Sequence, residues 1–386
     1  MVPGPRGRPP RSSSRRLILN TTLLHDWHVA AGAKMAPFAG YDMPISYPTG
    51  ALEEHHITRR SVGLFDIDHM GQLVVSGPDA DAFVSHTVSG AVLDMKDWDA
   101  RYSLLLDEKG LVLDDLFVYR LPGRWWIVVN ASNLAADYEW FQARAKAWKG
   151  TVHVEDKSAE TYMMAVQGPR ALELLDLVGS PKVSSFPRFT SGEIVIDGTK
   201  ILFGRTGYTG EDGGELFFPA AKAVALWEGF IKAGEKHGIE TKAIGLAARD
   251  SLRFEAGMPL HGHEISPAIN ALEAGFKWAC DFTKPDFIGK AALEAIAAAG
   301  VSRKLVGIEI TGGVPREGYE VLSATGEKIG ACVAGMFCPT VKKYAANAFV
   351  APAHAKVGTE VQVLCHGKPK PGLVVKRPLY LPAYRR

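Results

Sequence analysis

The sequence predicts an α+β protein that ends in a small all-β module. Up to about residue 300, segments rich in β-branched and aromatic residues alternate with helical segments, and beyond that point short strands alternate with glycine turns. The chain has 386 residues, which is enough for two or three domains. With 47% hydrophobic and 22% charged residues, its composition is that of a globular protein, which argues against wholesale disorder or a fibrous architecture.

The first elements that the sequence predicts are a helix, a loop and a hairpin. Residues 22–33 predict a helix, and residues 35–49 predict an irregular loop because they contain three prolines and Gly40. Between residues 102 and 120, β-branched and aromatic residues are interrupted by a turn at 107–110 that ends in glycine, which is typical of a hairpin.

Strands and helices then alternate along the middle of the chain. The segment 134–148 has Ala, Trp and Phe at helical spacing and predicts an amphipathic helix. We expect further strands at 72–75, 125–129, 163–166 and within 195–203, and further helices after Gly168 and at 220–237, 247–255 and 290–299. We expect the strands of the C-terminal module at 304–310, 319–322, 328–332, 348–350, 360–364 and 372–376.

The N-terminal end is strongly basic. Residues 1–16 hold five arginines, four prolines and no acid, so we expect residues 1–18 to form a disordered basic tail. The prolines oppose the amphipathic helix of a transit peptide, which favours an unstructured extension. The four cysteines lack CxxC spacing, which favours a reducing compartment. We therefore expect a cytoplasmic location, or the mitochondrial matrix if the tail is a transit peptide.

Several classes of function lose support. A formal charge of +2 is too small for a nucleic-acid binder, and no apolar run approaches the roughly 18 residues of a membrane span. Phosphoryl transfer and dinucleotide redox chemistry lose support because the chain has no P-loop, GxGxxG turn, GxSxG elbow or HExxH motif. The histidines at 55–56 and 261–263 lack a further cluster at ligand spacing, so we expect no metal.

A glycine-rich segment is the most unusual part of the chain. Residues 204–215 contain five glycines in twelve positions, with strands expected on either side. One interpretation is a flexible hairpin turn. The other is a backbone folded closely around a flat ligand, with Tyr208 as a stacking face and Glu215 pointing inward. A carboxylate at that place could accept two hydrogen bonds from the N3–H and 2-amino edge of a pterin.

Two adjacent acids lie inside an otherwise apolar strand. Because strand residues alternate between faces, either Asp114 or Asp115 should face inward. A buried carboxylate needs a partner, so this residue is either a structural hydrogen-bond anchor or an acid or base of a functional site. Periodicity alone leaves both interpretations open.

Six motifs in order, between about Leu24 and Tyr384, carry a resemblance to a known family. The chain resembles the glycine cleavage system T-protein (aminomethyltransferase) family of tetrahydrofolate-dependent C1 transferases. The motifs are KMAPFAGY at 34–41, LFDIDHMG at 64–71, LDD at 113–115, VQGP at 166–169, RTGYTGEDGGE at 205–215 and GLAARDSLR at 245–253.

The resemblance implies an α+β fold in a three-lobed arrangement. Two interleaved antiparallel sheet-plus-helix lobes would form the folate-binding aminomethyltransferase region, residues 19–285, and a C-terminal β-barrel domain would take up residues 300–386. Folate would lie in the gap between the lobes, as ligands often do at domain interfaces.

The resemblance also implies roles for particular residues. Asp115 matches the catalytic aspartate beside the folate N10, and Asp114 matches its less critical neighbour. Glu215 matches the glutamate that holds the pterin edge. The other residues matched to the folate site are Arg249, Tyr384, Met70, Tyr102, Tyr119, Asn130 and Tyr208. For Met70 and Tyr102, ordinary core packing is an equally good interpretation.

The implied reaction needs tetrahydrofolate as co-substrate and the lipoylated H-protein as partner. It moves an aminomethyl carbon to tetrahydrofolate, gives 5,10-methylenetetrahydrofolate and releases ammonia. The chain departs from the family at Ile269-Asn270, Asp68 and Cys338. These changes concern the donor of the carbon, so one alternative is a tetrahydrofolate-dependent O- or S-demethylase on the same fold. A second alternative is a non-catalytic folate-binding protein of iron–sulfur assembly. The latter is discounted because its cysteine signature is absent.

Overall fold

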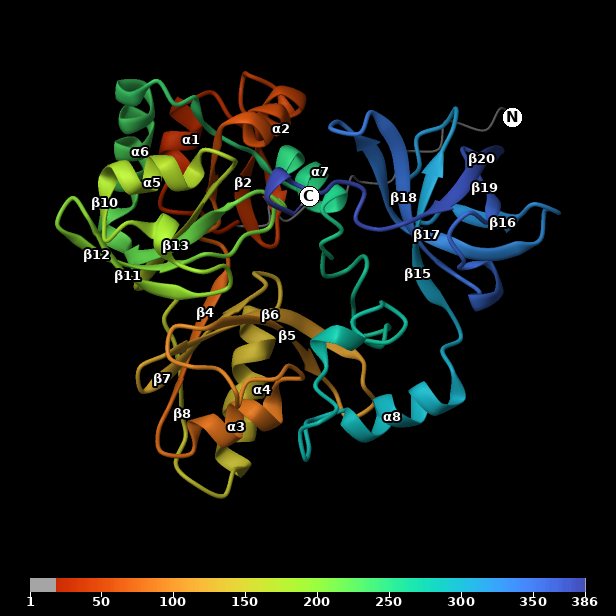
Figure 1. Ribbon diagram of the computed structural model, residues 1–386, viewed down its shortest axis with the longest axis horizontal. Coiled ribbons are helices and arrows are strands. Elements are labelled where there is room, and N and C mark those ends of the chain that lie inside the picture. Colours follow the sequence, from red (N-terminus) through yellow and green to blue (C-terminus); the bar gives the residue numbers. More distant parts are fainter. Residues whose placement is uncertain (1–18, 386) are drawn as a thin grey trace, which may run out of the picture.

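The computed structural model describes residues 19–385, which form three lobes (Figure 1). Two lobes are built on separate sheets, and the third is a closed six-stranded barrel. The predicted α+β fold with a C-terminal barrel is therefore confirmed. The predicted disordered basic tail, residues 1–18, lies outside the described residues.

The first lobe is a seven-stranded sheet with two helices packed on one of its faces. The buried residues of α5 (Ala171–Val178) and α6 (Ala223–His237) pack with those of the sheet in one core cluster. In spatial order the strands are β10 (Gly179–Ser180), β11 (Ser191–Ile196), β12 (Thr199–Gly204), β13 (Gly213–Pro219), β9 (Thr161–Gln167), β3 (Val62–Asp66) and β14 (Thr241–Ala243).

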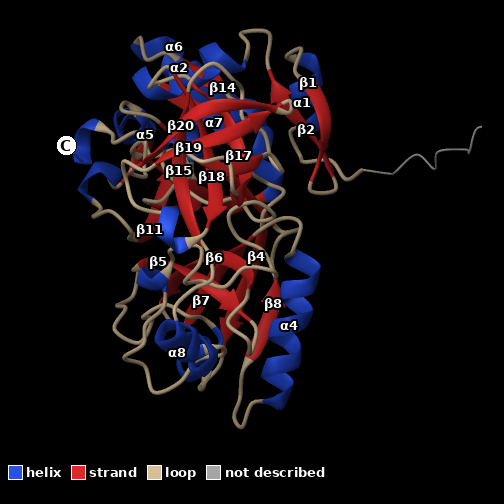
Figure 2. Ribbon diagram, turned by 90° about the vertical axis from the view of Figure 1, so that its right-hand side faces the viewer, coloured by secondary structure: helices blue, strands red, loops and turns tan. Residues whose placement is uncertain are grey.

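The second lobe is a five-stranded antiparallel sheet. Helices α3 (Ala80–Thr87) and α4 (Leu134–Ala147) share a core with it, and α4 lies along its outer side (Figure 2). The strands, in spatial order, are β5 (Ala100–Leu106), β6 (Val112–Leu121), β7 (Arg124–Val129), β4 (Gly71–Ser76) and β8 (His153–Asp156).

The chain passes between these two lobes twice, so they are interleaved. It leaves the first sheet after β3, builds the whole second sheet, and returns to the first sheet at β9. The prediction of antiparallel sheets holds except at one edge, where β14 pairs with β3 in parallel. That pairing follows the long α6 crossover, which can bring a strand back in the same direction.

The third lobe is the barrel, which follows α8 (Lys290–Ala299). Its interior holds one apolar cluster that includes Ile308, Val321, Ala348 and Val363, from four different strands. The strands are β15 (Lys304–Ile310), β18 (Lys343–Val350), β17 (Lys328–Cys338), β16 (Glu320–Ser323), β19 (Glu360–Cys365) and β20 (Lys368–Val375).

The structure corrects the prediction for residues 35–49. This segment forms a hairpin of β1 (Lys34–Phe38) and β2 (Tyr41–Ser46) instead of an irregular loop. Its two-residue turn, Ala39-Gly40, has φ values of 49° and 83°, which match the type I′ turn that suits hairpins. Prolines are tolerated because both strands of a two-stranded sheet are edges. The helix predicted at 22–33 is shorter, α1 (His25–Ala30).

A further core lies where the first two lobes meet. Phe65, Met163 and Phe217 of the first sheet pack there with Tyr119 and Trp126 of the second. Two helices extend this contact: α7 (Leu246–Glu255), whose Ala248 and Leu252 are in the same core, and α2 (Ala51–Arg60), which the sequence reading missed. This contact fixes the sheets relative to each other and so positions the strand β6 opposite β13.

Within residues 19–385, no helix is long and apolar enough to cross a membrane.

Candidate active site

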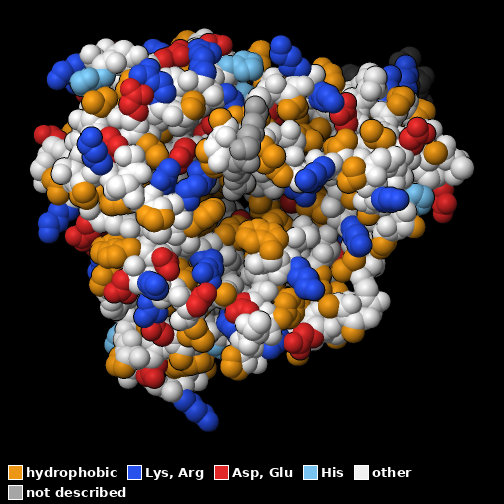
Figure 3. All heavy atoms as spheres, in the orientation of Figure 1, with side chains coloured by type: hydrophobic (Ala, Val, Ile, Leu, Met, Phe, Trp, Pro, Cys, Tyr) orange, Lys and Arg blue, Asp and Glu red, His pale blue; other side chains and the backbone are white. Residues whose placement is uncertain are grey.

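A cavity of about 300 Å³ lies where the lobes meet. Its wall combines parts of β6, β13 and α7 with the segments 256–260 and 276–278. A hollow is visible at the centre of the space-filling view, with hydrophobic side chains grouped beside it (Figure 3). Seven of the predicted site residues line the cavity: Met70, Tyr102, Asp115, Asn130, Tyr208, Glu215 and Arg249.

The two acids of β6 point to opposite faces of the sheet. Asp115 lines the cavity, whereas Asp114 is fully buried on the side where α4 begins. Asp114 accepts hydrogen bonds from the Asn130 backbone N–H at 2.9 Å, the Asn130 Nδ2 at 2.8 Å and the Asn133 Nδ2 at 2.7 Å. Of the two interpretations left open, the structural anchor therefore applies to Asp114.

Asp115 is held next to both an amide and an acid. Asn130 Nδ2 donates to Asp115 Oδ1 at 2.7 Å. Burial, together with the neighbouring Asp114 charge, raises the pKa of Asp115 well above its usual range. The Tyr102 hydroxyl is buried close to this carboxyl and has no well-aligned hydrogen-bond partner among residues 19–385. A carboxyl with a raised pKa in a cavity can take up a proton at neutral pH.

Glu215 lies at the other side of the cavity, on β13. The Thr206 hydroxyl donates to its Oε2 at 2.6 Å, and the Tyr119 hydroxyl donates to the same oxygen at 3.1 Å. Burial raises the pKa of Glu215, and these hydrogen bonds oppose the rise. No residue in the described part of the chain donates to Oε1, so this oxygen is free to bind a ligand.

Glycine is needed at one point for this arrangement. A Cβ on Gly204 would lie only 2.6 Å from the Tyr119 ring, so a larger residue would push Tyr119 away from Glu215. Tyr119 is fully buried behind Glu215 and is absent from the cavity wall. The glycine-rich segment thus forms part of the wall, through Gly207, Tyr208 and Glu215, and is more than a flexible turn.

Arg249 brings a positive charge to the wall. Its guanidinium lies 4.6 Å from the centre of the Tyr208 ring. Within residues 19–385 it makes no side-chain hydrogen bond. The Tyr208 hydroxyl donates to the Pro259 carbonyl, which fixes the ring. One face of the ring predicted to stack on a ligand is therefore already covered by Arg249.

Tyr384 lies outside the cavity wall. Its hydroxyl donates to the Gly210 carbonyl at 2.7 Å, and the Arg188 guanidinium lies 3.9 Å from its ring centre. Tyr384 therefore contacts the glycine-rich segment at Gly210, which is not part of the cavity wall. Its role as a ligand contact stays a prediction.

Sequence reasoning missed an aromatic group at the cavity. Trp278 is 69% exposed and stacks on Tyr102, with ring centres 5.3 Å apart. Phe117 and Phe189 stack at 6.3 Å on another part of the wall. These pairs join segments far apart in the chain, so no local pattern indicates them. Thr206 was also missed, although it lies inside the predicted glycine-rich motif.

The departures from the family pattern lie mostly away from this wall. Asp68 and Cys338 do not line the cavity, and neither does Ile269-Asn270. Burial, with the nearby Asp66 charge, raises the pKa of Asp68 to about 7. The Cys338 thiol is fully buried. The segments that carry these changes therefore leave the Asp115 and Glu215 surroundings intact.

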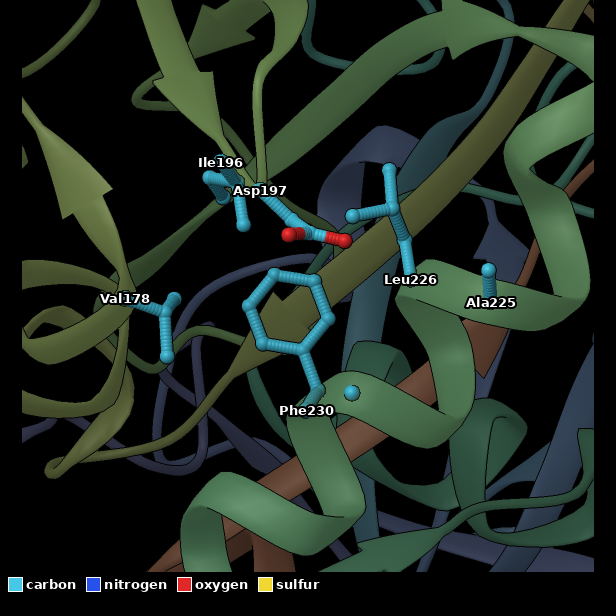
Figure 4. A pocket seen from close by; sticks show the side chains of 7 residues that line it. Val178, Ile196, Asp197, Ala225, Leu226 and Phe230 are labelled. Carbon is cyan, nitrogen blue, oxygen red and sulfur yellow. The ribbon is translucent and has the colours of Figure 1, made fainter.

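A second cavity of about 330 Å³ provides a contrast. It lies between α6 and the turn after β11 in the first lobe, and its wall is apolar except for Asp197 (Figure 4). Polar groups converge in the central cavity but not in this one. Within residues 19–385, no group of three or more His, Cys, Asp or Glu residues is placed to hold a metal ion.

Comparison with protein families gives two matches that together span most of the chain. Residues 24–284 match the GCVT N-terminal domain, and residues 303–380 match the glycine cleavage T-protein C-terminal barrel domain.

Individual relatives are similar over nearly their whole length. The chain is 42% identical to the aminomethyltransferase of Symbiobacterium thermophilum, covering 95% of this chain and 99% of that protein. It is also 42% identical to the aminomethyltransferase of Moorella thermoacetica, covering 94% and 98%. Among solved structures, the glycine cleavage system aminomethyltransferase T from Bartonella henselae superimposes with a TM-score of 0.88 at 34% identity, covering 95% of this chain and 100% of that one.

Proposed function

Because the chain belongs to the glycine cleavage T-protein family and is an aminomethyltransferase, we propose that its central cavity binds tetrahydrofolate with Glu215 and presents it to Asp115. The family uses tetrahydrofolate and works with the H-protein of the glycine cleavage system. In the proposed reaction, the aminomethyl carbon on the lipoyl group of the H-protein passes to tetrahydrofolate, giving 5,10-methylenetetrahydrofolate and ammonia.

One observation carries this proposal: the side chains of Glu215, on β13, and Asp115, on β6, line the same cavity. Glu215 has an oxygen free for the two-donor edge of a pterin. The Arg249 guanidinium makes no hydrogen bond to the described residues 19–385, and it would attract an anionic part of the ligand. The buried Tyr102 hydroxyl lies beside the Asp115 carboxyl without a well-aligned partner in the described part of the chain, and a polar ligand atom would supply one. These groups fit a flat, polar, two-ended ligand.

The residues supply positioning and a proton acceptor. When bound, tetrahydrofolate supplies the nitrogen nucleophiles that receive the carbon. Glu215, Arg249 and Tyr208 would fix one end of the ligand, so that the other end lies at Asp115. Asp115 would accept a hydrogen bond from the reacting nitrogen and take its proton, which its raised pKa favours. The aromatic residues Trp278 and Phe276 would keep water from this end of the cavity.

The direct test has two arms. Calorimetry measures tetrahydrofolate binding to the purified protein, and ammonia release is followed after aminomethyl-loaded H-protein is added. We expect binding in the first arm, and turnover only with both substrates in the second. Binding without turnover would reject the donor but keep the folate site, and no binding would reject the site itself.

The two alternative functions gain no support. The relatives compared over nearly the full chain are aminomethyltransferases, and the acid that matches the catalytic aspartate is present and lines the cavity. A cytoplasmic location stays a prediction.

A further inference from the structure

A third acid, Asp137, lies behind the two acids of β6. It is in the first turn of α4 and is 3% exposed. Its carboxyl lies against that of Asp114, within hydrogen-bond reach, and close enough to Asp115 to feel its charge. Three carboxyl groups thus share one buried region, and the reaction proposed above uses only Asp115.

Hydrogen-bond donors are distributed unequally between Asp114 and Asp137. Asp114 accepts three N–H groups, from Asn130 and Asn133. The Asp137 side chain receives no N–H donor among residues 19–385, and its Oδ2 is buried without a partner. Donors of this kind stabilise a hydrogen-bond acceptor, so Asp114 is the acceptor of the pair.

Protonation accounts for the unpartnered oxygen of Asp137. A buried carboxylate without donors would cost several kcal/mol. A neutral carboxyl is instead a hydrogen-bond donor, and the adjacent Asp114 carboxylate is the acceptor. Burial and the charges of Asp114 and Asp115 raise the pKa of Asp137 far above its usual range. Both charged groups acting on Asp137 are acids, so each favours its neutral form.

The pair is connected to the cavity through one amide. The two hydrogens of Asn130 Nδ2 are directed to Asp114 Oδ1 at 2.8 Å and to Asp115 Oδ1 at 2.7 Å. The orientation of this amide therefore depends on where the Asp114 carboxylate is held. A hydrogen bond from Asp137 also withdraws negative charge from Asp114, which is the chain neighbour of Asp115 on the opposite face of the sheet.

We propose that Asp137 is a positioning residue for Asp115: as a neutral acid it donates a hydrogen bond to Asp114, which fixes Asn130 and hence the carboxylate of Asp115. This inference rests on the proposed function, because it takes Asp115 to be the proton acceptor. Asp137 touches neither substrate and acts only through Asp114 and Asn130.

The first test is independent of turnover. Infrared spectra of the full-length protein without ligand, recorded at pH 8, should contain a carbonyl band of a buried neutral carboxyl group. We expect the band to disappear in Asp137→Asn and to persist in Asp115→Asn. Absence of the band in the unaltered protein, or its persistence in Asp137→Asn, would overturn the proposal even if the protein is a fully active aminomethyltransferase.

The second test uses activity and its pH dependence. Asp137→Ala should lower kcat by about tenfold or more while tetrahydrofolate Kd stays within about twofold. Without the proton shared by Asp137, Asp114 carries its full charge, so the acid limb of the kcat profile should move to higher pH. Asp137→Asn keeps a donor to Asp114 and should restore kcat to within about threefold, with the limb close to its original position.

A matched control separates positioning from stability. Phe141 lies on the same helix, in the core of the second lobe. The substitution Phe141→Leu should therefore lower stability without moving the acid limb of the kcat profile. If Asp137→Ala only lowers stability, like Phe141→Leu, or weakens folate binding as much as kcat, the proposal is wrong. If Asp137→Ala does not fold, the infrared band and the pH profile of kcat measured for Asp137→Asn decide whether Asp137 positions Asp115. If the unaltered protein lacks aminomethyl transfer, the proposed function fails while the infrared result still tests the acid pair.

Discussion

The two ends of the central cavity hold their carboxyl groups in different ways. At the Glu215 end, burial raises the pKa of the carboxyl, and the two hydroxyls that donate to one carboxylate oxygen oppose that rise together with the positive charge of Arg249. At the Asp115 end, the closest charged groups are acids, and the donor with good geometry is an amide. The first arrangement favours a fixed anion that binds. The second favours a carboxyl group that gains and loses a proton.

Replacing the acid at the reactive end should give the largest effect. Asp115→Asn keeps the shape of the side chain but removes the proton acceptor, so we expect kcat to fall by about two or more orders of magnitude. Tetrahydrofolate affinity should remain within a few-fold, measured by calorimetry. Unchanged turnover would remove Asp115 from the reaction, and a parallel loss of binding would make it a second binding residue.

Replacing the acid at the binding end should affect affinity first. Glu215→Ala leaves the pterin edge without its acceptor and should weaken tetrahydrofolate binding by about 10- to 100-fold. Glu215→Gln is the matched control, because it retains one acceptor and should lose less. Calorimetry that shows unaltered affinity in Glu215→Ala would contradict the assignment of the two ends.

Removing one of the hydroxyls behind Glu215 should have a smaller effect of the same kind. Tyr119→Phe deletes one of the two donors to Oε2 while keeping the buried ring, so we expect about a three- to tenfold loss of folate affinity. Thr206→Val should act similarly. A larger loss of kcat than of affinity would mean that Tyr119 contributes to the reactive end instead.

The pH dependence of activity should reflect the Asp115 end alone. A proton acceptor must be ionised, and the pKa of Asp115 is raised, so kcat should fall as the pH falls through a value well above 3.8, the ordinary pKa of Asp. Folate affinity should change less over the same range. An acid limb at about pH 4 would show that Asp115 is not perturbed as the structure indicates.

The stability of the protein should fall as the pH rises, whereas kcat rises with pH. This is the smallest effect that we expect. An acid whose pKa is raised on folding binds its proton more tightly in the native state, so the free energy of unfolding falls as the pH rises through the window above 3.8. Asp115→Asn removes part of this dependence. Its melting temperature at pH 8 should therefore exceed that of the unaltered protein by about 2 °C or more. Equal melting temperatures of Asp115→Asn and the unaltered protein at pH 8 would show that an ionised, buried Asp115 does not destabilise the protein.

Local patterns in the sequence predicted most of the elements. The helix α8 and the strand β15 have the predicted bounds, and the turn at residues 107–110 joins β5 and β6 as expected. The hairpin at residues 34–46 was missed because prolines usually end strands, and only its place as an isolated two-stranded sheet makes them acceptable. Helix α2 was missed as well, since its polar residues are satisfied by contacts with distant segments.

The sequence by itself determined the family, the order of the elements and the identity of the acids at both ends of the cavity, because these depend on motifs within short segments. Strand periodicity left open which of Asp114 and Asp115 faces inward, and only the resemblance to the family favoured Asp115. Nothing in the sequence indicated Asp137 or the Tyr102–Trp278 pair. Only the tertiary structure decided these points. Strand alternation places neighbouring residues on opposite faces of the sheet, but it does not say which of them faces the ligand. That choice depends on how the two sheets pack across β6 and β13.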